Sequence, residues 1–266
     1  MKNDQIKRDA AVAGYFYPDN PEVLRTTVRQ LMMEARTDAP VPKALIIPHA
    51  GYVYSGITAA IAYATLRPAA DRIRHVVLLG PAHRVYTRGL ALCHATHFST
   101  PLGEVEVDRE AVERLQALPQ VNYSDAAHRD EHSLEVHLPF LQYLLGEFTL
   151  VPLVVGESSP QEVGEVLDLL WGDEETVIII SSDLSHFLDY ETASRIDRET
   201  MQAIEQLQLE KIGSNQACGC MPVRGLLHIA RQRGMSTRVL DYRNSGDTAG
   251  NRDRVVGYGA VSFYQN

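Results

Sequence analysis

Three histidines in the sequence each follow a short apolar run, and they are His49, His83 and His186. A lone histidine after a strand is usually a hydrogen-bonded structural residue. Three at equivalent ends of parallel strands would instead meet at one edge of a sheet, where ligands bind in open α/β folds. Two imidazoles and a third ligand make a catalytic metal site with open positions, and Fe(II) oxygenases use a carboxylate as the third ligand. The apolar runs cover residues 44–48, 75–80 and 177–180.

Asp183 lies three residues before His186 and has two chemical interpretations. Its carboxylate could complete the metal site, or it could orient His186 as a general base. A Ser/His/Asp hydrolase is a rival interpretation, because Ser181, Ser182 and Ser185 flank the same pair. The rival is weakened by the absence of the Gly-x-Ser-x-Gly elbow that such hydrolases use.

Cys218 is a candidate soft ligand. It lies at or just before a predicted helix start, where the helix dipole is expected to lower the pKa of its thiol. A thiolate there would favour Cu(I), Zn or Fe over Mg or Ca. The alternative is a buried, inert cysteine, and the pair Cys218 and Cys220 is by itself a weak signal.

The segment 128–137 is dense in ionisable side chains. His128 and His132 have the i, i+4 spacing of a helical zinc site, although no glutamate follows the first histidine as the zinc-protease motif requires. An ion-paired surface and a site lining both stay open for this segment. The residues predicted to line the pocket are Glu131, His132, Glu135 and Tyr54.

The hydrophobic pattern alternates between strand-like and helix-like segments. This order predicts a single-domain α/β/α sandwich over residues 1–266 with a largely parallel central sheet. Asn20 and Pro21 predict a helix start, and Pro139 predicts a kink or restart in a later helix. The predicted strands cover 44–48, 72–80, 90–98, 148–155, 176–181, 237–242 and 255–264, and the predicted helices cover 21–35, 57–66, 109–118, 133–145, 160–170, 189–207 and a segment ending at 233.

Bulk composition narrows the class of partner and the compartment. The net charge of −9 argues against a nucleic-acid or anionic-membrane surface, since both need basic patches. No apolar run reaches the ~20 residues of a membrane span. The chain starts with a polar stretch without a signal-peptide core, and its three cysteines are an odd, low count. These features predict reduced thiols and a cytoplasmic protein.

Taken together, the motifs resemble the MEMO family, known in microbes as protein B of the AmmeMemoRadiSam system. The matching segments are Ala-Gly-Tyr-Phe-Tyr-Pro at 13–18, Pro-His-Ala-Gly-Tyr-x-Tyr-Ser-Gly at 48–56, Leu-Gly-Pro-Ala-His at 79–83, Asp-Glu-His-Ser-Leu-Glu-Val-His-Leu-Pro at 130–139, Ser-Ser-Asp-Leu-Ser-His at 181–186 and Ala-Cys-Gly at 217–219. The resemblance covers nearly the whole chain and implies a fold similar to class III extradiol dioxygenases, which are non-haem iron enzymes.

By motif, the resemblance implies that His49, His83 and Cys218 are metal ligands and that Asp183 and His186 lie beside the metal, with His186 as general base. The third iron ligand of the dioxygenases is a glutamate, so Cys218 makes this site softer. Cys220 and Met221 stand where other members carry Arg-His, which is expected to bias the site towards copper. The resemblance also implies radical-SAM and AMMECR-type partners, and animal members are linked to signalling adaptor roles.

The function expected from the sequence is therefore a metal-binding redox enzyme of dioxygenase type. It would hold Fe(II) or copper, with zinc as a further option, and act on a small aromatic or other small molecule. A non-enzymatic module that binds a peptide or protein in the same pocket is the first alternative. A metal-dependent hydrolase that uses Zn-bound water is the second.

Overall fold

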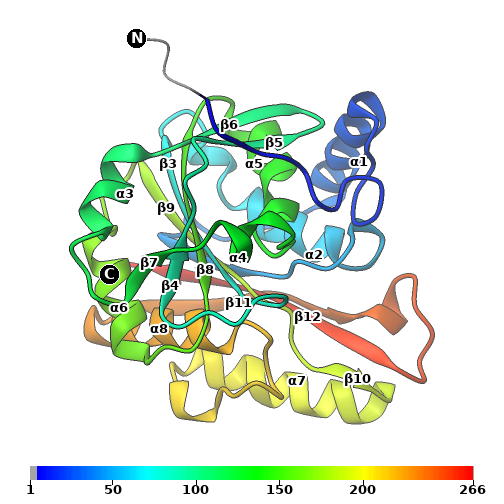
Figure 1. The fold of residues 1–266 in the computed structure, drawn as a ribbon. Coiled ribbons are helices and arrows are strands. Elements are labelled where there is room, and N and C mark those ends of the chain that lie inside the picture. Colours follow the sequence, from blue (N-terminus) through cyan, green and yellow to red (C-terminus); the bar gives the residue numbers. More distant parts are fainter. Residues whose placement is uncertain (1–4, 266) are drawn as a thin grey trace.

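A mixed β-sheet runs through the centre of the molecule, with helices on both of its faces (Figure 1). The computed structural model describes residues 5–265, and within them twelve strands form this one sheet. The main path of the sheet has the order β1-β5-β6-β8-β3-β9-β2-β12-β10. Strand β11 pairs with β12 outside this path, and β4 joins β7 to β8.

The centre of the sheet is parallel. Its register pairs Ile47 with Ser181 and Leu79 with Ile180, so three neighbouring strands end at the same edge. In an open α/β sheet this carboxyl edge is where side chains from different strands can converge on a ligand. The four parallel strands are β8 (Thr149–Val155), β3 (His75–Pro81), β9 (Thr176–Ser181) and β2 (Ala44–Ile47).

The remaining strands extend the sheet to both sides. Strand β12 runs antiparallel to β2 and carries β10 and β11, while β6 continues the parallel part beside β8. Their bounds are β1 (Lys7–Arg8), β4 (Leu90–Leu92), β5 (His97–Thr100), β6 (Gly103–Val107), β7 (Val121–Tyr123), β10 (His186–Leu188), β11 (Ser236–Asn244) and β12 (Val255–Tyr264).

Helices form the outer layers. On one face α1 (Pro21–Glu34), α2 (Tyr52–Ala64) and α5 (Leu138–Leu145) pack together, and α2 covers β2, β11 and β12. On the other face α8 (Cys220–Gln232) packs against β3 and β9, with α6 (Pro160–Leu169) beside it and α7 (Tyr190–Glu205) over β11 and β12. The shorter helices are α3 (Arg109–Leu115), α4 (Asp125–Arg129), η1 (Arg67–Ala69), η2 (Glu135–His137), η3 (Leu209–Lys211) and η4 (Ser245–Asp247).

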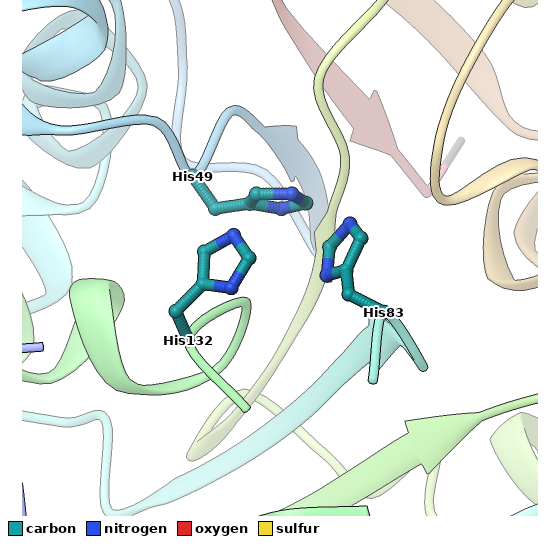
Figure 2. Close-up of side chains that lie close together, drawn as sticks. All are labelled: His49, His83 and His132. Atoms are coloured by element: carbon teal, nitrogen blue, oxygen red, sulfur yellow. The ribbon is translucent and has the colours of Figure 1, made fainter. Parts of the chain in front are cut away.

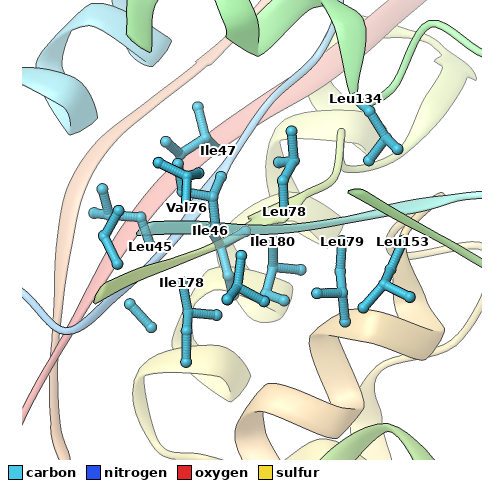
Figure 3. Packing of buried hydrophobic residues seen from close by; sticks show 14 of the residues in the cluster. Leu45, Ile46, Ile47, Val76, Leu78, Leu79, Leu134, Leu153, Ile178 and Ile180 are labelled. Atoms are coloured by element: carbon cyan, nitrogen blue, oxygen red, sulfur yellow. The ribbon is translucent and has the colours of Figure 1, made fainter. Parts of the chain in front are cut away.

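Apolar side chains fill the space on both sides of the central strands (Figure 3). Ile178, Ile179 and Ile180 are fully buried although they point to alternate faces, as expected for a parallel strand covered by two helical layers. This rigid base holds the polar residues that follow each strand. No helix in residues 5–265 has the length and apolar character needed to span a membrane.

The helix starts follow local capping chemistry. The side chain of Asn20 accepts hydrogen bonds from the backbone N–H groups of Glu22 and Val23, with Pro21 as the first residue of α1. Ser159 and Glu162 form a reciprocal capping box at α6. Asp189 caps α7 by accepting from the N–H of Thr192. These side chains satisfy backbone donors that would otherwise lack partners.

Three predicted elements differ markedly from the structure, while β3 begins three residues later than predicted and α3 ends three residues earlier. Helix α2 begins at Tyr52 rather than at residue 57, because the buried Tyr52 ring anchors its first turn and donates through Oη to Val136 O at 2.7 Å. The single strand predicted for 90–98 is two strands, β4 and β5. Between them the backbone N–H of His94 donates to the Asp125 carboxylate and not to a neighbouring strand. The helix predicted for 133–145 is divided into η2 and α5, and the restart near Pro139 is confirmed.

Candidate metal centre

His49 directly follows Pro48 at the carboxyl end of β2 and is 1% exposed. Its backbone N–H donates to Asp183 Oδ1 at 2.7 Å, which ties the β2 and β9 strand ends together. Its ring nitrogen Nδ1 lies 2.6 Å from Ser181 Oγ. Both backbone and ring are therefore held by residues at the end of β9.

A buried hydrogen-bond chain fixes the proton on the His49 ring. Ser181 Oγ donates to Ser133 O at 2.6 Å, so its lone pairs must accept from Nδ1–H of His49 and from Nε2–H of His137, which lies 2.9 Å away. Tyr63 Oη then donates to Nδ1 of His137 at 2.8 Å. In this arrangement every proton has an acceptor, and Nε2 of His49 keeps an unprotonated lone pair that faces Cys218 Sγ.

His83 follows β3 and is held by Glu131. The Glu131 carboxylate accepts from the backbone N–H of His83 at 2.8 Å and lies 2.9 Å from its ring nitrogen Nδ1. A carboxylate at Nδ1 places the ring proton there and leaves Nε2 available as a ligand, which is the arrangement found around metal-bound histidines. Burial alone would raise the pKa of Glu131, but the hydrogen bonds and charge of His83 lower it to about 2.

His132 approaches from the loop between α4 and η2. Glu131 also accepts from the backbone N–H of His132, and Phe16 packs on the His132 ring with centroids 4.7 Å apart. Gly80 in β3 makes room for this loop, because a Cβ there would lie 2.6 Å from Ser133 Oγ. The Nδ1 atom of His132 lies 3.4 Å from Glu131 Oε1, yet it is buried without a hydrogen-bond partner.

The three rings converge from three separate segments (Figure 2). One ring nitrogen of each of His49, His83 and His132 lies within 4.8 Å of the others, and no other such group of metal-binding side chains occurs in residues 5–265. The ring centroids are 5.1 Å apart for His49–His83, 5.3 Å for His49–His132 and 4.6 Å for His83–His132. The unpartnered nitrogen of His132 and the free lone pairs fit a metal ion bound by imidazoles.

The electrostatics keep the His49 and His132 rings neutral, as metal ligands must be. Burial lowers the pKa of His49 well below its ordinary value, and charge on His132 and His83 would lower it further. Burial also lowers the pKa of His132 to about 4, although Glu131 opposes this. Neutral imidazoles present lone pairs at neutral pH without first losing a proton.

Cys218 lies next to the cluster. Its Sγ is 3.4 Å from Nε2 of His49 and accepts from the backbone N–H of Asp183 at 3.3 Å. The Gly219 backbone packs against β9, where a Cβ would meet Ser181 O at 2.6 Å, so this segment is seated tightly. Burial and the Asp183 charge raise the pKa of the Cys218 thiol, so the expected lowering by the helix dipole is wrong.

Asp183 and His186 border the same site. Asp183 is 4% exposed, and burial raises its pKa to about 7 despite the hydrogen bond from His49 N–H. Nδ1 of the His186 ring lies 2.8 Å from Leu184 O, so it carries the proton and Nε2 is a free base. Burial lowers the pKa of His186, with a smaller contribution from His83 charge. The Asp183 carboxylate accepts from the backbone N–H of His49. Within residues 5–265 it makes no hydrogen bond to the His186 ring.

Other predicted residues lie elsewhere. The i, i+4 histidines separate, because α4 ends at Arg129 and the buried His128 donates to Ala91 O at 2.8 Å, away from the cluster. Glu135 contacts the N-terminal segment rather than the histidines. Tyr54 is on α2 and is 38% exposed. Burial raises the pKa of the neighbouring Tyr258, and Asp183 and Tyr54 raise it further.

The serine hydrolase arrangement predicted as a rival is not formed. Ser181 bonds to His49 and His137, and Ser182 Oγ donates to Asp183 O. Ser185 Oγ is buried without a partner. In the described part of the chain, none of the three serines hydrogen-bonds to His186.

Sequence reasoning missed the position of His132, which was predicted to line the pocket rather than to join the ligand set. Its segment is a loop and follows no strand, so the strand-end pattern could not find it. The useful signal was Glu131, because a carboxylate beside two histidines is the usual orienting group at a metal site.

The fold and the cluster define an α/β protein with a candidate three-imidazole metal centre at the carboxyl edge of its sheet. A family model described as "Memo-like protein" matches residues 8–262. MEMO1 family proteins are similar over nearly their whole length, with 38% identity in Archaeoglobus fulgidus (96% of this chain, 99% of the relative) and 36% in Aquifex aeolicus (96% and 98%). The chain therefore belongs to the Memo family, as the motifs predicted.

One solved structure, an uncharacterized protein from Escherichia coli K12, matches with a TM-score of 0.48 and 16% identity. The match covers 81% of this chain and 98% of the chain in that structure. Family membership and the largely parallel sheet confirm the predicted fold class, an α/β sandwich of the class III extradiol dioxygenase type.

Proposed function

We propose that this protein is a metal-dependent redox enzyme of oxygenase type that acts on a small molecule. His49 and His83 hold Fe(II) or copper, and the third donor is Cys218 or His132. The observation that carries the proposal is the convergence of three imidazoles, one ring nitrogen of each lying within 4.8 Å of the others, with His49 buried and His83 open to the surface. Three protein ligands do not fill the coordination sphere of the metal, so a position stays open for a substrate or oxygen.

The chain's own residues supply positioning and proton transfer. A bound Fe or Cu ion would supply electron-transfer chemistry and polarise a coordinated group. Ser181 and Glu131 hold the His49 and His83 rings with Nε2 free. His186 accepts a proton at Nε2, because its Nδ1–H is already engaged by Leu184 O.

The donor set also supports a choice of metal. The Cys218 sulfur is 3.4 Å from His49 Nε2, and Met221 lines the same cavity as His83 and Cys218. Thiolate and thioether donors favour copper and iron over Mg or Ca. A metal would also lower the pKa of the thiol, offsetting the burial that raises it in the metal-free protein.

A zinc hydrolase is the second candidate, since three imidazoles are a common catalytic zinc set. Zinc would lower the pKa of a bound water, and the site would be redox-silent. A peptide-binding or protein-binding role, including association with radical-SAM or AMMECR-type proteins, stays a prediction from the family resemblance.

Metal content tests the proposal. Protein prepared anaerobically is analysed for Fe, Cu and Zn in the parent and in His49→Ala, His132→Ala and Cys218→Ala. His94→Ala is the matched control, because His94 is an exposed histidine paired with Asp125 away from the cluster. We expect one Fe or Cu per chain in the parent and in the control, and its loss in His49→Ala.

The other two variants identify the third donor, because only the true ligand should release the metal when it is removed. Zinc alone, with no redox response, would favour the hydrolase. No bound metal in the parent after reconstitution would contradict the proposal and leave peptide or protein binding.

A further inference from the structure

A cavity of about 360 Å³ opens beside the candidate metal centre. Its lining includes His83 and Cys218, together with the apolar side chains of Val85, Val155 and Met221. This volume lies at the small end of ligand pockets, so the cavity suits a compact molecule rather than a cofactor such as a dinucleotide. Because His83 and Cys218 line the cavity, a molecule bound in it lies next to candidate metal donors.

The carboxylates around this cavity already have hydrogen-bond donors, whereas its guanidinium group has no hydrogen-bond or ion-pair partner within residues 5–265. Glu131, behind His83, already accepts from the backbone N–H groups of His132 and Ser133 as well as from His83. Glu157 on the rim accepts from Tyr86 Oη at 2.6 Å.

Arg84 also lines the cavity, and among the described residues its guanidinium makes no hydrogen bond or ion pair. Both nearby carboxylates therefore have neutral or histidine donors, and the guanidinium is left for a ligand.

Arg84 is also close to the candidate metal centre. It follows His83 directly in the chain, and its charge acts on the His132 ring together with burial and the charge on His83. A guanidinium presents a rigid fork of donors that matches a carboxylate with two parallel hydrogen bonds. An anion held there would have its apolar body against the side chains that line the cavity.

We propose that this cavity binds a small organic carboxylate, with its anionic group paired to Arg84 and its other end at the His83–Cys218 wall. This inference rests on the proposed function, because it names the class of substrate for the same site. Arg84 is a specificity-determining residue in this account.

A matched pair of probes tests the charge requirement directly. The probes are 3,4-dihydroxybenzoate and its neutral isostere 3,4-dihydroxybenzamide, titrated anaerobically into protein of known metal content. We expect the parent to bind the benzoate at least about tenfold more tightly than the benzamide, since a charge-assisted pair is roughly twice as strong as a neutral one. Arg84→Gln should remove this preference and leave benzamide binding unchanged.

Arg88→Gln is the control, because it makes the same charge change on an exposed residue of the same loop that does not line the cavity. It should keep the preference, and Arg84→Lys should keep part of it. Equal affinity for both probes in the parent, no binding of either, or a preference that survives Arg84→Gln would overturn the inference.

The metal content separates the two claims. Metal-loaded protein without a carboxylate preference contradicts the inference alone. If the parent binds no metal, the proposed function fails, and an Arg84-dependent preference in the metal-free protein would still support the carboxylate site.

Discussion

Ser181 is the residue on which the proton positions of the histidine cluster depend. It accepts from His49 and His137 and donates to Ser133 O. Ser181→Ala should remove both acceptor contacts and let the His49 ring rotate or change tautomer. We expect metal affinity to fall about ten- to hundredfold, the effect typical of losing an orienting partner, and stability to fall by about 1–3 kcal/mol. Isothermal titration with Cu or Zn and urea unfolding measure the two effects.

Ser262→Ala is the matched control, because Ser262 is also fully buried and hydrogen-bonded but lies on β12, donating to Arg238 O. It should lose stability without losing metal affinity. Unchanged metal affinity in Ser181→Ala would show that the serine is only structural.

His128 gives a pH-dependent contribution to stability. Burial lowers its pKa to about 4, below the ordinary value of 6.5. The unfolded chain therefore binds a proton at a higher pH than the folded chain does, so stability is full above pH 6.5 and falls as the pH drops towards 4. His128→Gln should reduce the slope of unfolding free energy against pH by up to about 1.4 kcal/mol per pH unit in this window. Urea unfolding at several pH values measures the slope, and an identical slope in parent and variant would contradict this assignment.

At the scale of elements, Glu135 holds the N-terminal segment, residues 8–17, through hydrogen bonds and an ion pair. This fully buried carboxylate accepts from Arg8, the backbone N–H groups of Ala11 and Val12, and Tyr17 Oη. Glu135→Gln leaves the buried Arg8 charge without its partner, which should cost about 3–5 kcal/mol. Denaturant unfolding measures the loss, and limited proteolysis should cut the segment before residue 18 more readily.

Glu104→Gln is the control for this prediction, since it breaks the exposed pair of Lys7 and Glu104 on the same segment. Such a pair is worth only about 0–1 kcal/mol. A Glu135→Gln variant as stable as Glu104→Gln would show that the segment is held by packing alone.

The elements predicted best from the sequence are those whose own residues form a clear hydrophobic run or helix start. Strands β9 and β12 have the predicted bounds, because their apolar runs are buried on both faces and end at polar residues. Helix α1 was predicted from its start at Asn20 and Pro21 and from the helical spacing of its apolar residues. Short elements such as α4 and β10 were not predicted, since tertiary contacts hold them rather than local propensity.

The same distinction applies to the site. His49, His83 and Asp183 could be placed together because strand ends in a parallel sheet share an edge. His132 could not, because its position depends on the Gly80 contact and on Glu131, which only the folded chain brings together. The direction of the Cys218 pKa shift was also beyond sequence reasoning, because burial and the Asp183 charge, which raise the pKa, depend on the folded structure.

At the scale of the whole molecule, the candidate centre joins the ends of β2 and β3 to the loop before η2, so an ion there would link separate parts of the chain. A ligand that binds only the folded state stabilises it, by about 2.7 kcal/mol at a free concentration one hundred times its Kd. We expect added Cu or Zn to raise the melting temperature of the parent and not of His49→Ala. Differential scanning calorimetry with and without EDTA checks this, and equal shifts in both proteins would indicate binding elsewhere.

The most direct test of the central claim is anomalous diffraction from crystals loaded with Fe or Cu, with data collected across the absorption edge of the metal. We expect one strong peak between the rings, bonded to Nε2 of His49 and Nε2 of His83 at about 2.0–2.1 Å, with a third bond from Cys218 or His132. A peak at another place, or bonds through Nδ1 of His49 or His83, would contradict it.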